Sequence, residues 1–282
     1  MDTYTVRRGE SLTAIARRHG VPLHLLIQVN GITDPNRIKV GQVLEIPAMT
    51  TDASDHPLPE EPAPRPETAA VAINRTTFQL PPSQYVGEET PKDLVVLHFT
   101  AGTSARSALQ TWMANDARIA TAYVLDVDGT VYELFDPRFW AFHLGIKGAA
   151  NANFRHDRRS VGIEIANAGP LKLSGDRLCW WPGEYTTECC KVADRERYVK
   201  ASFRGFDHYV AYTEAQYGAL GPLVAHLCER FSIPRRLPSI AKRTQADVTD
   251  YFKDFSGIAS HQNFRSDKFD VGPAFDWQRL SI

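Results

Sequence analysis

In the larger, C-terminal part of the chain, apolar residues gather in short runs of strand length. Residues 94–99 are almost wholly apolar, as expected of a buried strand. The segments 122–125 and 130–135 flank Asp128-Gly129, a dipeptide typical of a hairpin turn. Residues 160–165 predict a further strand, in which one carboxylate stands among apolar neighbours. These runs predict a β-sheet.

Two helices are predicted beside these strands. Ser104 can cap a helix whose apolar side chains recur at helical spacing as far as Met113. Thr213 and Gln216 have the spacing of a capping box before a second helix. Pro222 lies inside that helix and predicts a kink or break, because proline cannot donate the helical hydrogen bond. Together the segments predict an α/β domain with a mixed central β-sheet flanked by helices.

The N-terminal residues predict a small βααβ domain. Tyr4–Val6 has the pattern of a strand, and Ser11 can cap a first helix. Pro22 suits the first turn of a second helix, which the pair Asn30-Gly31 would end. Val43–Ile46, directly before a proline, reads as the last strand.

A proline-rich stretch separates the two predicted domains. Residues 49–75 hold prolines at near-alternate positions and few large apolar groups, which favours an extended, semi-rigid spacer. We therefore assign residues 1–48 to the small domain, 49–75 to a linker and 76–282 to the large domain. The large domain is long enough to bury most of its apolar surface around one core.

Composition narrows the functional classes. The 282 residues carry 32 Lys+Arg against 33 Asp+Glu, a formal charge of −1, and 43% of them are hydrophobic. This is ordinary globular composition, and the near-zero charge gives no electrostatic basis for nucleic-acid binding. No apolar run is long enough for a membrane span, and the N-terminus lacks the apolar core of a secretory signal. We therefore expect synthesis in the cytoplasm without a signal peptide.

The four cysteines, Cys179, Cys189, Cys190 and Cys228, form no CxxC pair. A zinc site built from all four would need paired short spacings, so the simplest interpretation is four reduced thiols. A disulfide between the 179–190 segment and Cys228 stays open for a protein that acts outside the cytosol.

Two histidines and one aspartate are candidate metal ligands. His98 ends the apolar run and is followed by small residues from Thr100 onward, which would leave room beside it. His261 precedes Asp270 by nine residues. Two imidazoles and a carboxylate would leave one position open on a tetrahedral zinc ion, the arrangement of catalytic sites. Spacing alone makes only a weak case for this set.

The N-terminal domain resembles the LysM module. The text YTVRRGESLTAIARRHGV, the step Asn30-Gly31-Ile32 and the text VGQVLEIP fall in register with that module across residues 4–47. LysM modules bind glycans that contain N-acetylglucosamine, in peptidoglycan or chitin. The resemblance implies glycan contacts in two loops, at Gly9, Glu10, Ser11, Asn30, Gly31 and Ile32. Single side chains such as Ile32 fit a core role equally well, and backbone groups of these loops are the better candidates.

The large domain resembles the zinc-dependent type 2 N-acetylmuramoyl-L-alanine amidases over residues 90–278. Phage lysins, cell-wall recycling amidases and peptidoglycan recognition proteins belong to this family. The motifs that carry the resemblance are LHFTAG at 97–102, DVDGTVYEL at 126–134, FHLG at 142–145, SVGIEIAN at 160–167, YTEAQ at 212–216 and HQNFRSDKFDVGPAFDW at 261–277. Both resemblances point to peptidoglycan.

The amidase resemblance implies roles for individual residues. One Zn²⁺ ion per catalytic domain would be bound by His98, His261 and Asp270, and the implied catalytic residues are Glu164, Lys268 and Tyr123. Glu164 would act as general base, and Lys268 would stabilise the charge that develops on the carbonyl oxygen. Simpler interpretations are a salt-bridge role for Glu164 and a solvated loop charge for Lys268.

Substrate binding is assigned to Thr100, His143 and Asn167. His143 could instead pack in the cleft wall or donate a hydrogen bond behind a metal ligand. Residues 171–208 depart from the family pattern and are rich in aromatic side chains. We expect this segment to fold over one side of the groove and contact glycan or stem peptide, although capping of the core fits equally well.

The sequence thus predicts a peptidoglycan hydrolase that cleaves the amide bond between N-acetylmuramic acid and L-alanine and is targeted to the wall by LysM. The alternative is a recognition protein that binds peptidoglycan without cleaving it, but the presence of Asp270, Glu164 and Lys268 favours hydrolysis. We expect action in the periplasm or cell wall, after non-classical export or lysis-linked release, as an antibacterial effector or a phage endolysin. An effector would imply a cognate immunity protein.

Overall fold

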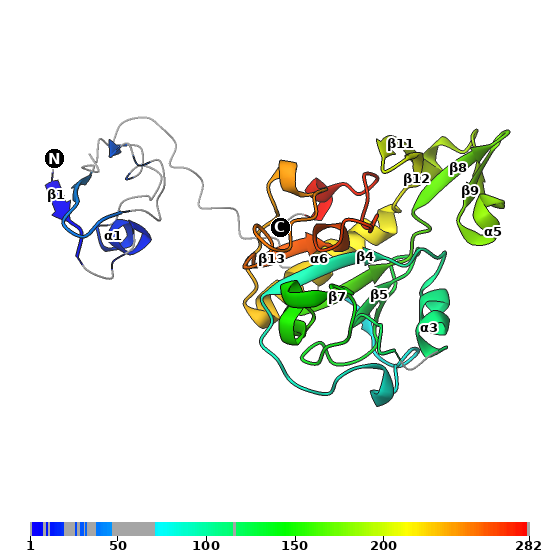
Figure 1. The fold of residues 1–282 in the computed structure, drawn as a ribbon, viewed down its shortest axis with the longest axis horizontal. Coiled ribbons are helices and arrows are strands. Elements are labelled where there is room, and N and C mark those ends of the chain that lie inside the picture. The colour runs from blue at the N-terminus through cyan, green and yellow to red at the C-terminus, as the bar shows by residue number, and fades with distance from the viewer. Residues whose placement is uncertain are drawn as a thin grey trace. The chain divides into compact units, whose positions relative to one another are not determined.

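The chain folds as two compact units, residues 1–63 and 64–282, each described here by itself (Figure 1). A computed structural model describes the following residues: 2–7, 10, 12–19, 26, 29–30, 32, 38–46, 71–114 and 117–280.

The small unit pairs its two terminal strands. β1 (Asp2–Thr5) and β2 (Val43–Ile46) are antiparallel, and α1 (Leu12–Arg18) lies between them in the chain. Its core is formed by the buried side chains of Val6, Leu12, Ile15, Ala16, Leu26, Leu44 and Ile46. Most of the predicted second helix lies outside the described residues.

The larger unit begins before residue 76. β3 (Ile73–Asn74) pairs in parallel with β6 (Val131–Glu133), so these residues belong to the large sheet. The predicted linker 49–75 therefore extends too far at its C-terminal end, because a two-residue edge strand has too little pattern to be recognised in sequence. Residues 49–70 of that prediction lie outside the described residues.

The central sheet of the large unit is mixed, as predicted. Its six strands follow the order β13-β4-β7-β5-β6-β3. β13 (Gly257–Ser260), β4 (Leu94–Phe99), β7 (Ser160–Ile165) and β5 (Tyr123–Leu125) are parallel, whereas β5 and β6 form an antiparallel hairpin. The carboxyl ends of four neighbouring strands therefore meet at one edge.

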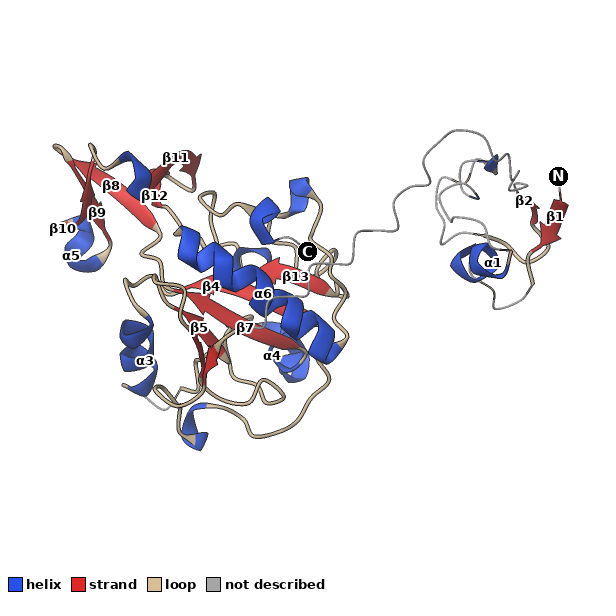
Figure 2. Cartoon of the chain, turned by 180° about the vertical axis from the view of Figure 1, so that it is seen from behind, coloured by secondary structure: helices blue, strands red, loops and turns tan. Residues whose placement is uncertain are grey.

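Two apolar cores lie on opposite faces of this sheet. One holds Val95, Leu97 and Ile163 beneath α3 (Ala105–Met113) and α6 (Glu214–Phe231), and Figure 2 shows α6 crossing the strands. The other holds Leu94, Val96, Leu144, Phe252, Phe255, Ala259 and Phe264. Alternate residues of β4 thus point to different cores. The remaining short helices are α4 (Arg155–Arg158), α5 (Pro182–Tyr185) and 3₁₀ turns at 82–84, 148–154, 195–197, 240–242, 261–263 and 277–280.

The two long helices begin as predicted. The Ser104 hydroxyl accepts a hydrogen bond from the Ser107 amide, and Thr213 and Gln216 form the full capping box of α6. The break expected at Pro222 is not seen, because α6 continues through it to Phe231. The carbonyl that loses its helical hydrogen bond at the proline belongs to Gly218, which is exposed, so water can take the place of the missing donor.

Residues 170–210 form a second sheet rather than an irregular loop. Its five strands, in the order β10-β9-β8-β12-β11, are all antiparallel. Their bounds are β8 (Pro170–Ser174), β9 (Arg177–Trp180), β10 (Thr187–Lys191), β11 (Tyr198–Phe203) and β12 (Phe206–Val210). We call this segment the insertion sheet.

The cysteines are all free thiols. Cys228 packs in the core beneath α6, whereas Cys179, Cys189 and Cys190 belong to the insertion sheet. The disulfide left open by the sequence is therefore not formed.

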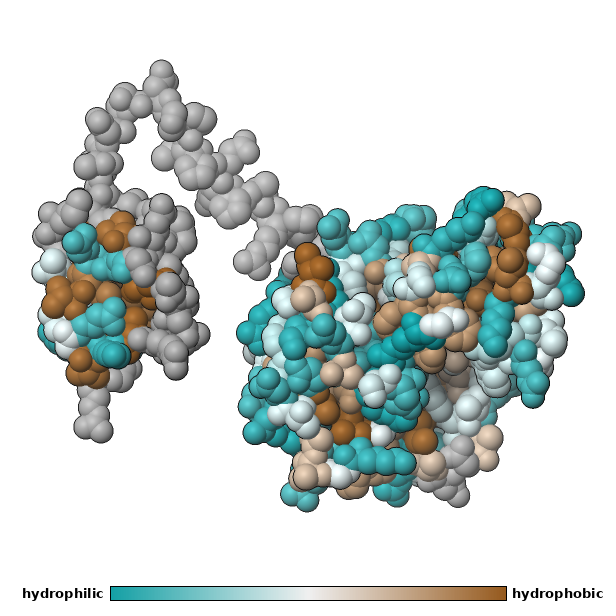
Figure 3. Space-filling model, turned by 45° about the horizontal axis from the view of Figure 1, so that its top comes forward, coloured by the Kyte–Doolittle hydropathy of each residue, from teal (hydrophilic) through white to brown (hydrophobic). Residues whose placement is uncertain are grey.

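The face of the large unit visible in Figure 3 is mainly hydrophilic, with small, separate apolar areas. Among the described helices, none has both the length and the apolar character that a bilayer span requires.

Candidate metal centre and active site

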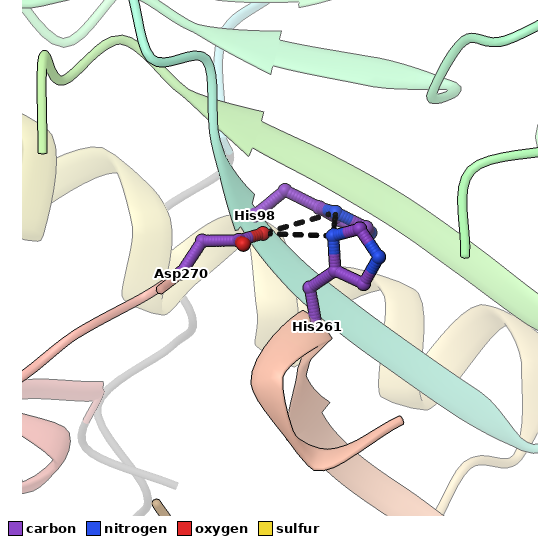
Figure 4. Close-up of side chains that lie close together, drawn as sticks. All are labelled: His98, His261 and Asp270. Carbon is purple, nitrogen blue, oxygen red and sulfur yellow. Dashed lines mark hydrogen bonds and ion pairs between the residues drawn. The ribbon is translucent and has the colours of Figure 1, made fainter. Parts of the chain in front are cut away.

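His98, His261 and Asp270 converge on one point at the carboxyl edge of the central sheet (Figure 4). The Nδ1 atoms of the two histidines are 3.0 Å apart. The Asp270 Oδ2 atom lies 3.3 Å from Nδ1 of His98 and 3.0 Å from Nδ1 of His261. All three side chains are buried. Within the described residues, no other group of this kind is found.

Parallel pairing brings these residues together from distant parts of the chain. His98 lies near the end of β4, and His261 directly follows β13, its parallel neighbour. On the other side of β4, Glu164 of β7 is the register partner of His98, so their side chains project from the same face. Pairing between strands distant in sequence therefore positions both histidine ligands and the candidate base.

Hydrogen bonds behind the ligands fix the proton positions on both rings. The His261 Nε2–H donates to the Leu144 carbonyl at 2.9 Å, which leaves the Nδ1 lone pair facing Asp270. The Ser160 hydroxyl donates to the His156 carbonyl at 2.6 Å and so accepts from His143 Nε2 at 2.8 Å. His143 Nδ1 must then accept from His98 Nε2–H at 2.9 Å. The Nδ1 lone pair of His98 consequently faces the same point.

This donor set fits a small divalent cation. Two imidazole lone pairs and a carboxylate oxygen face one another with no hydrogen between them, so they repel one another. A positive ion at this point would remove the repulsion. Ligand atoms at 2.0–2.1 Å from a tetrahedral zinc ion lie about 3.3 Å from one another, close to the separations of 3.0–3.3 Å seen here. Nitrogen and carboxylate ligands are those that zinc prefers.

The electrostatics of the site favour proton transfer. Burial raises the pKa of the Glu164 carboxyl well above its usual value, and the charge of Asp270 adds to this effect, whereas the Lys268 ammonium opposes it. The Oε2 atom of Glu164 is buried and has no hydrogen-bond partner in the described chain. Burial lowers the pKa of His98 to about 4, which keeps the ring neutral.

Tyr123 does not belong to the site, and its predicted catalytic role is corrected. It is the register partner of Ile163, one residue before Glu164, so it projects from the opposite face of the sheet. Its side chain is fully buried in the α6 core, and its hydroxyl donates to Glu133 at 2.7 Å.

The three predicted substrate contacts use their polar atoms within the protein. The Thr100 hydroxyl donates to the Gly102 carbonyl at 3.0 Å. The Asn167 side chain donates to the Val210 carbonyl at 3.2 Å and accepts from Gly169 at 2.8 Å. His143 is buried between His98 and Ser160, so it supports a ligand rather than lining the cleft.

In the small unit, two predicted glycan contacts have structural roles. The Glu10 carboxylate accepts from the Tyr4 hydroxyl, the Arg7 amide and Arg18, and its pKa falls to about 2, mainly through the Arg7 amide bond. The Asn30 amide bridges the Leu26 carbonyl to Glu45 of β2. Ile32 packs against the core. Gly9, Ser11 and Gly31 lie outside the described residues.

The sequence predicts that residues 171–208, Trp181 among them, fold over one side of the groove, but it does not identify the contacts that they make near the site. The Trp181 Nε1–H donates to the Ala101 carbonyl, three residues after His98, at 2.6 Å. Arg204 donates to the carbonyls of Ser266 and Lys268. The density of aromatic residues in 171–208 was the available signal, but it does not identify contacts between residues so distant in sequence.

A mixed α/β sheet whose carboxyl edge carries a His-His-Asp group beside a half-buried glutamate has the features of a metal-dependent hydrolase. The model of the N-acetylmuramoyl-L-alanine amidase family matches residues 88–273, more than half of the chain, and the chain belongs to this family. The LysM domain model matches residues 4–47.

Individual relatives match shorter parts. N-acetylmuramoyl-L-alanine amidase XlyB of Bacillus subtilis is 39% identical over 61 residues, 22% of this chain and 19% of the relative. XlyA of the same organism is 45% identical over 60 residues, 21% of this chain and 20% of the relative. The match thus spans about a fifth of either relative. The solved N-acetylmuramyl-L-alanine amidase AmiD from E. coli, in complex with an anhydro-N-acetylmuramic acid peptide, is 20% identical, with a TM-score of 0.43 over 74% of this chain and 64% of that chain.

Proposed function

We propose that the protein hydrolyses the amide bond between N-acetylmuramic acid and the L-alanine of peptidoglycan stem peptides, with one zinc ion bound by His98, His261 and Asp270. The observation that carries the proposal is the convergence of three lone-pair donors beside Glu164, whose Oε2 atom is buried. Zinc, when bound, supplies Lewis acidity that polarises the scissile carbonyl and acidifies water.

The residues around this group supply proton transfer and charge stabilisation. Glu164, once ionised, accepts the proton of the attacking water and later delivers it to the leaving amine. Its raised pKa brings its proton affinity closer to that needed at neutral pH. The Lys268 ammonium, which lowers the pKa of both Glu164 and His98 and so acts near both, would stabilise the negative charge developing on the carbonyl oxygen.

Purified sacculi test this assignment. The wild-type protein loaded with zinc should release stem peptides that begin with L-alanine, and a chelator should stop the release. Glu164→Gln should lower the rate by about 10²- to 10⁴-fold, because it removes the proton acceptor. Glu188→Gln, at an exposed position of β10, is the matched control and should retain activity.

Release of sugar fragments alone would contradict the amidase assignment. Binding to sacculi without any release by the zinc-loaded protein would favour the alternative, a recognition protein that does not cleave.

We further propose that the LysM unit binds N-acetylglucosamine-containing glycan and that the protein acts in the periplasm or cell wall, where that glycan lies. Non-classical export as an antibacterial effector and lysis-linked release as an endolysin would both deliver it there. An effector would require a cognate immunity protein in the producing cell. Directing the chain to the periplasm of a test bacterium should cause lysis, whereas retention in the cytoplasm should not.

A further inference from the structure

The insertion sheet contacts the loop that carries Lys268. At the turn between β11 and β12, the Arg204 guanidinium donates to two backbone carbonyls, those of Ser266 and Lys268. Both bonds come from one guanidinium nitrogen, Nη1, which carries two hydrogens and can therefore donate to both carbonyls. Arg204 therefore connects two residues, 62 and 64 positions later in the sequence, to the tip of a separate sheet.

Aromatic packing reinforces this connection. Phe206 meets Phe269 edge to face, with ring centroids 5.7 Å apart. The Arg204 guanidinium lies 5.9 Å from the centroid of Phe269 and 5.0 Å from that of Phe203. The contact thus combines two hydrogen bonds with cation–π and aromatic interactions on the residue directly after Lys268.

The backbone at this turn does not favour arginine. Arg204 and Gly205 have φ angles of +48° and +83°, the left-handed conformations of a two-residue hairpin turn in which asparagine and glycine are preferred. Arginine at the first position carries a conformational cost that asparagine would reduce. The guanidinium contacts offset that cost, which indicates a role for the side chain itself.

Other contacts hold Asp270 independently. The Gln262 amide donates to the Asp270 carbonyl at 2.9 Å, and the buried Tyr212 hydroxyl donates to the Val271 carbonyl at 2.8 Å. In contrast, the Lys268 amide reaches only the Arg265 carbonyl, at 3.3 Å, within its own loop. Among the described contacts of this loop, Arg204 is the one from outside it that fixes the Lys268 backbone.

We propose that Arg204 is a positioning residue that holds the Lys268 backbone and so places its ammonium at the reaction centre. The insertion sheet is then part of the catalytic apparatus, through a contact distinct from any substrate binding. The role of Arg204 in catalysis rests on the proposed amidase function. Its contact with the loop that carries Lys268 does not.

The test compares Arg204→Asn with Arg204→Lys and with Arg177→Ala, a control at an exposed position of β9 in the same sheet. Asparagine suits the turn, so Arg204→Asn should fold. In the zinc-loaded protein, it should lower kcat by about 10- to 100-fold, with KM changed less than about twofold and zinc content unchanged. Arg204→Lys should be intermediate, because an ammonium can still donate to the carbonyls but lacks the planar face that lies over Phe203 and Phe269. Arg177→Ala should match wild type.

Hydrogen exchange provides a readout that does not depend on activity. Arg204→Asn should speed amide exchange at residues 266–269 and leave residues 261–263 and strands β11 and β12 unchanged. Wild-type exchange at 266–269, wild-type kcat, or loss of protection across the whole insertion sheet would each overturn the proposal. If wild type cleaves no peptidoglycan, the amidase function fails, and the exchange experiment still decides whether Arg204 holds the loop.

Discussion

At the level of single side chains, the proton positions on the two ligand histidines depend on hydrogen-bond partners that lie behind the candidate metal site. The relay from His98 through His143 to Ser160 ends on a main-chain carbonyl, so each donor has one direction available. Such outer partners orient metal ligands and raise their basicity. The Gly162 backbone leaves room for this relay, because a β-carbon there would lie 3.1 Å from His143 Nδ1.

We expect Ser160→Ala and His143→Ala to lower zinc affinity by about 10- to 100-fold. Both remove the acceptor or donor that keeps the His98 Nδ1 lone pair directed at the metal. Competition with a chromophoric chelator measures the change. His226→Ala, a control on α6, should keep wild-type zinc affinity. Equal losses of affinity in all three variants would contradict the relay.

The ionisation of Glu164 should set the acid limb of the pH–activity profile. A general base must be ionised, and the folded-state pKa of Glu164 is raised, so kcat/KM should fall as pH decreases through a value above the usual ~4.3 of glutamate. Lys268→Gln removes a positive charge that lowers this pKa, so the acid limb should move to higher pH. A limb that stays in place or moves to lower pH in Lys268→Gln would contradict this reading.

At the level of elements, the sequence predicted best where the signal is local. The apolar run of β4, the Asp128-Gly129 hairpin and both helix caps depend on neighbouring residues, and all are present. The catalytic role that the family resemblance implies for Tyr123 is wrong here, because one residue of register places its side chain on the face of the sheet opposite Glu164. The insertion sheet was missed because its short strands are largely exposed and make most of their pairing within the insertion.

Two glycines of α6 should respond oppositely to alanine. Gly218 has open space around its α-carbon, so Gly218→Ala should stabilise the fold by about 0.5–1 kcal/mol through helix propensity. At Gly221, a β-carbon would lie 3.1 Å from the Leu280 carbonyl, so Gly221→Ala should lose that gain or destabilise. Thermal unfolding of the two variants measures the difference, and equal gains would show that the C-terminal turn does not pack closely on α6.

At the level of the whole molecule, family membership was predictable from motifs spread along the chain, whereas the domain boundary was not. β3 lies within the predicted linker, and Ile73 pairs with Val131 at the edge of the large sheet. A two-residue strand that follows a proline-rich segment is not recognised in the sequence, because two residues show no periodicity.

We expect a chain that begins at Val71 to be as stable as the large unit of the full protein, and one that begins at Thr76 to melt at least about 2–4 °C lower. The shorter chain loses the β3 pairing and the partly buried side chains of Val71 and Ile73. Calorimetry measures both. The chain from Val71 should also cleave soluble muropeptides but bind sacculi more weakly, and unchanged sacculus binding would contradict a targeting role for the LysM unit.

The two ends of the insertion sheet meet at one point beside the central sheet. The Val210 amide donates to the Gly169 carbonyl at 3.0 Å, and the Asn167 side chain reaches the Val210 carbonyl at 3.2 Å. Chain ends that meet in this way can be joined by a short loop with little loss of the host fold. The segment can therefore vary in length and sequence without rebuilding the central sheet, as long as Arg204 and Trp181 keep their contacts beside the site.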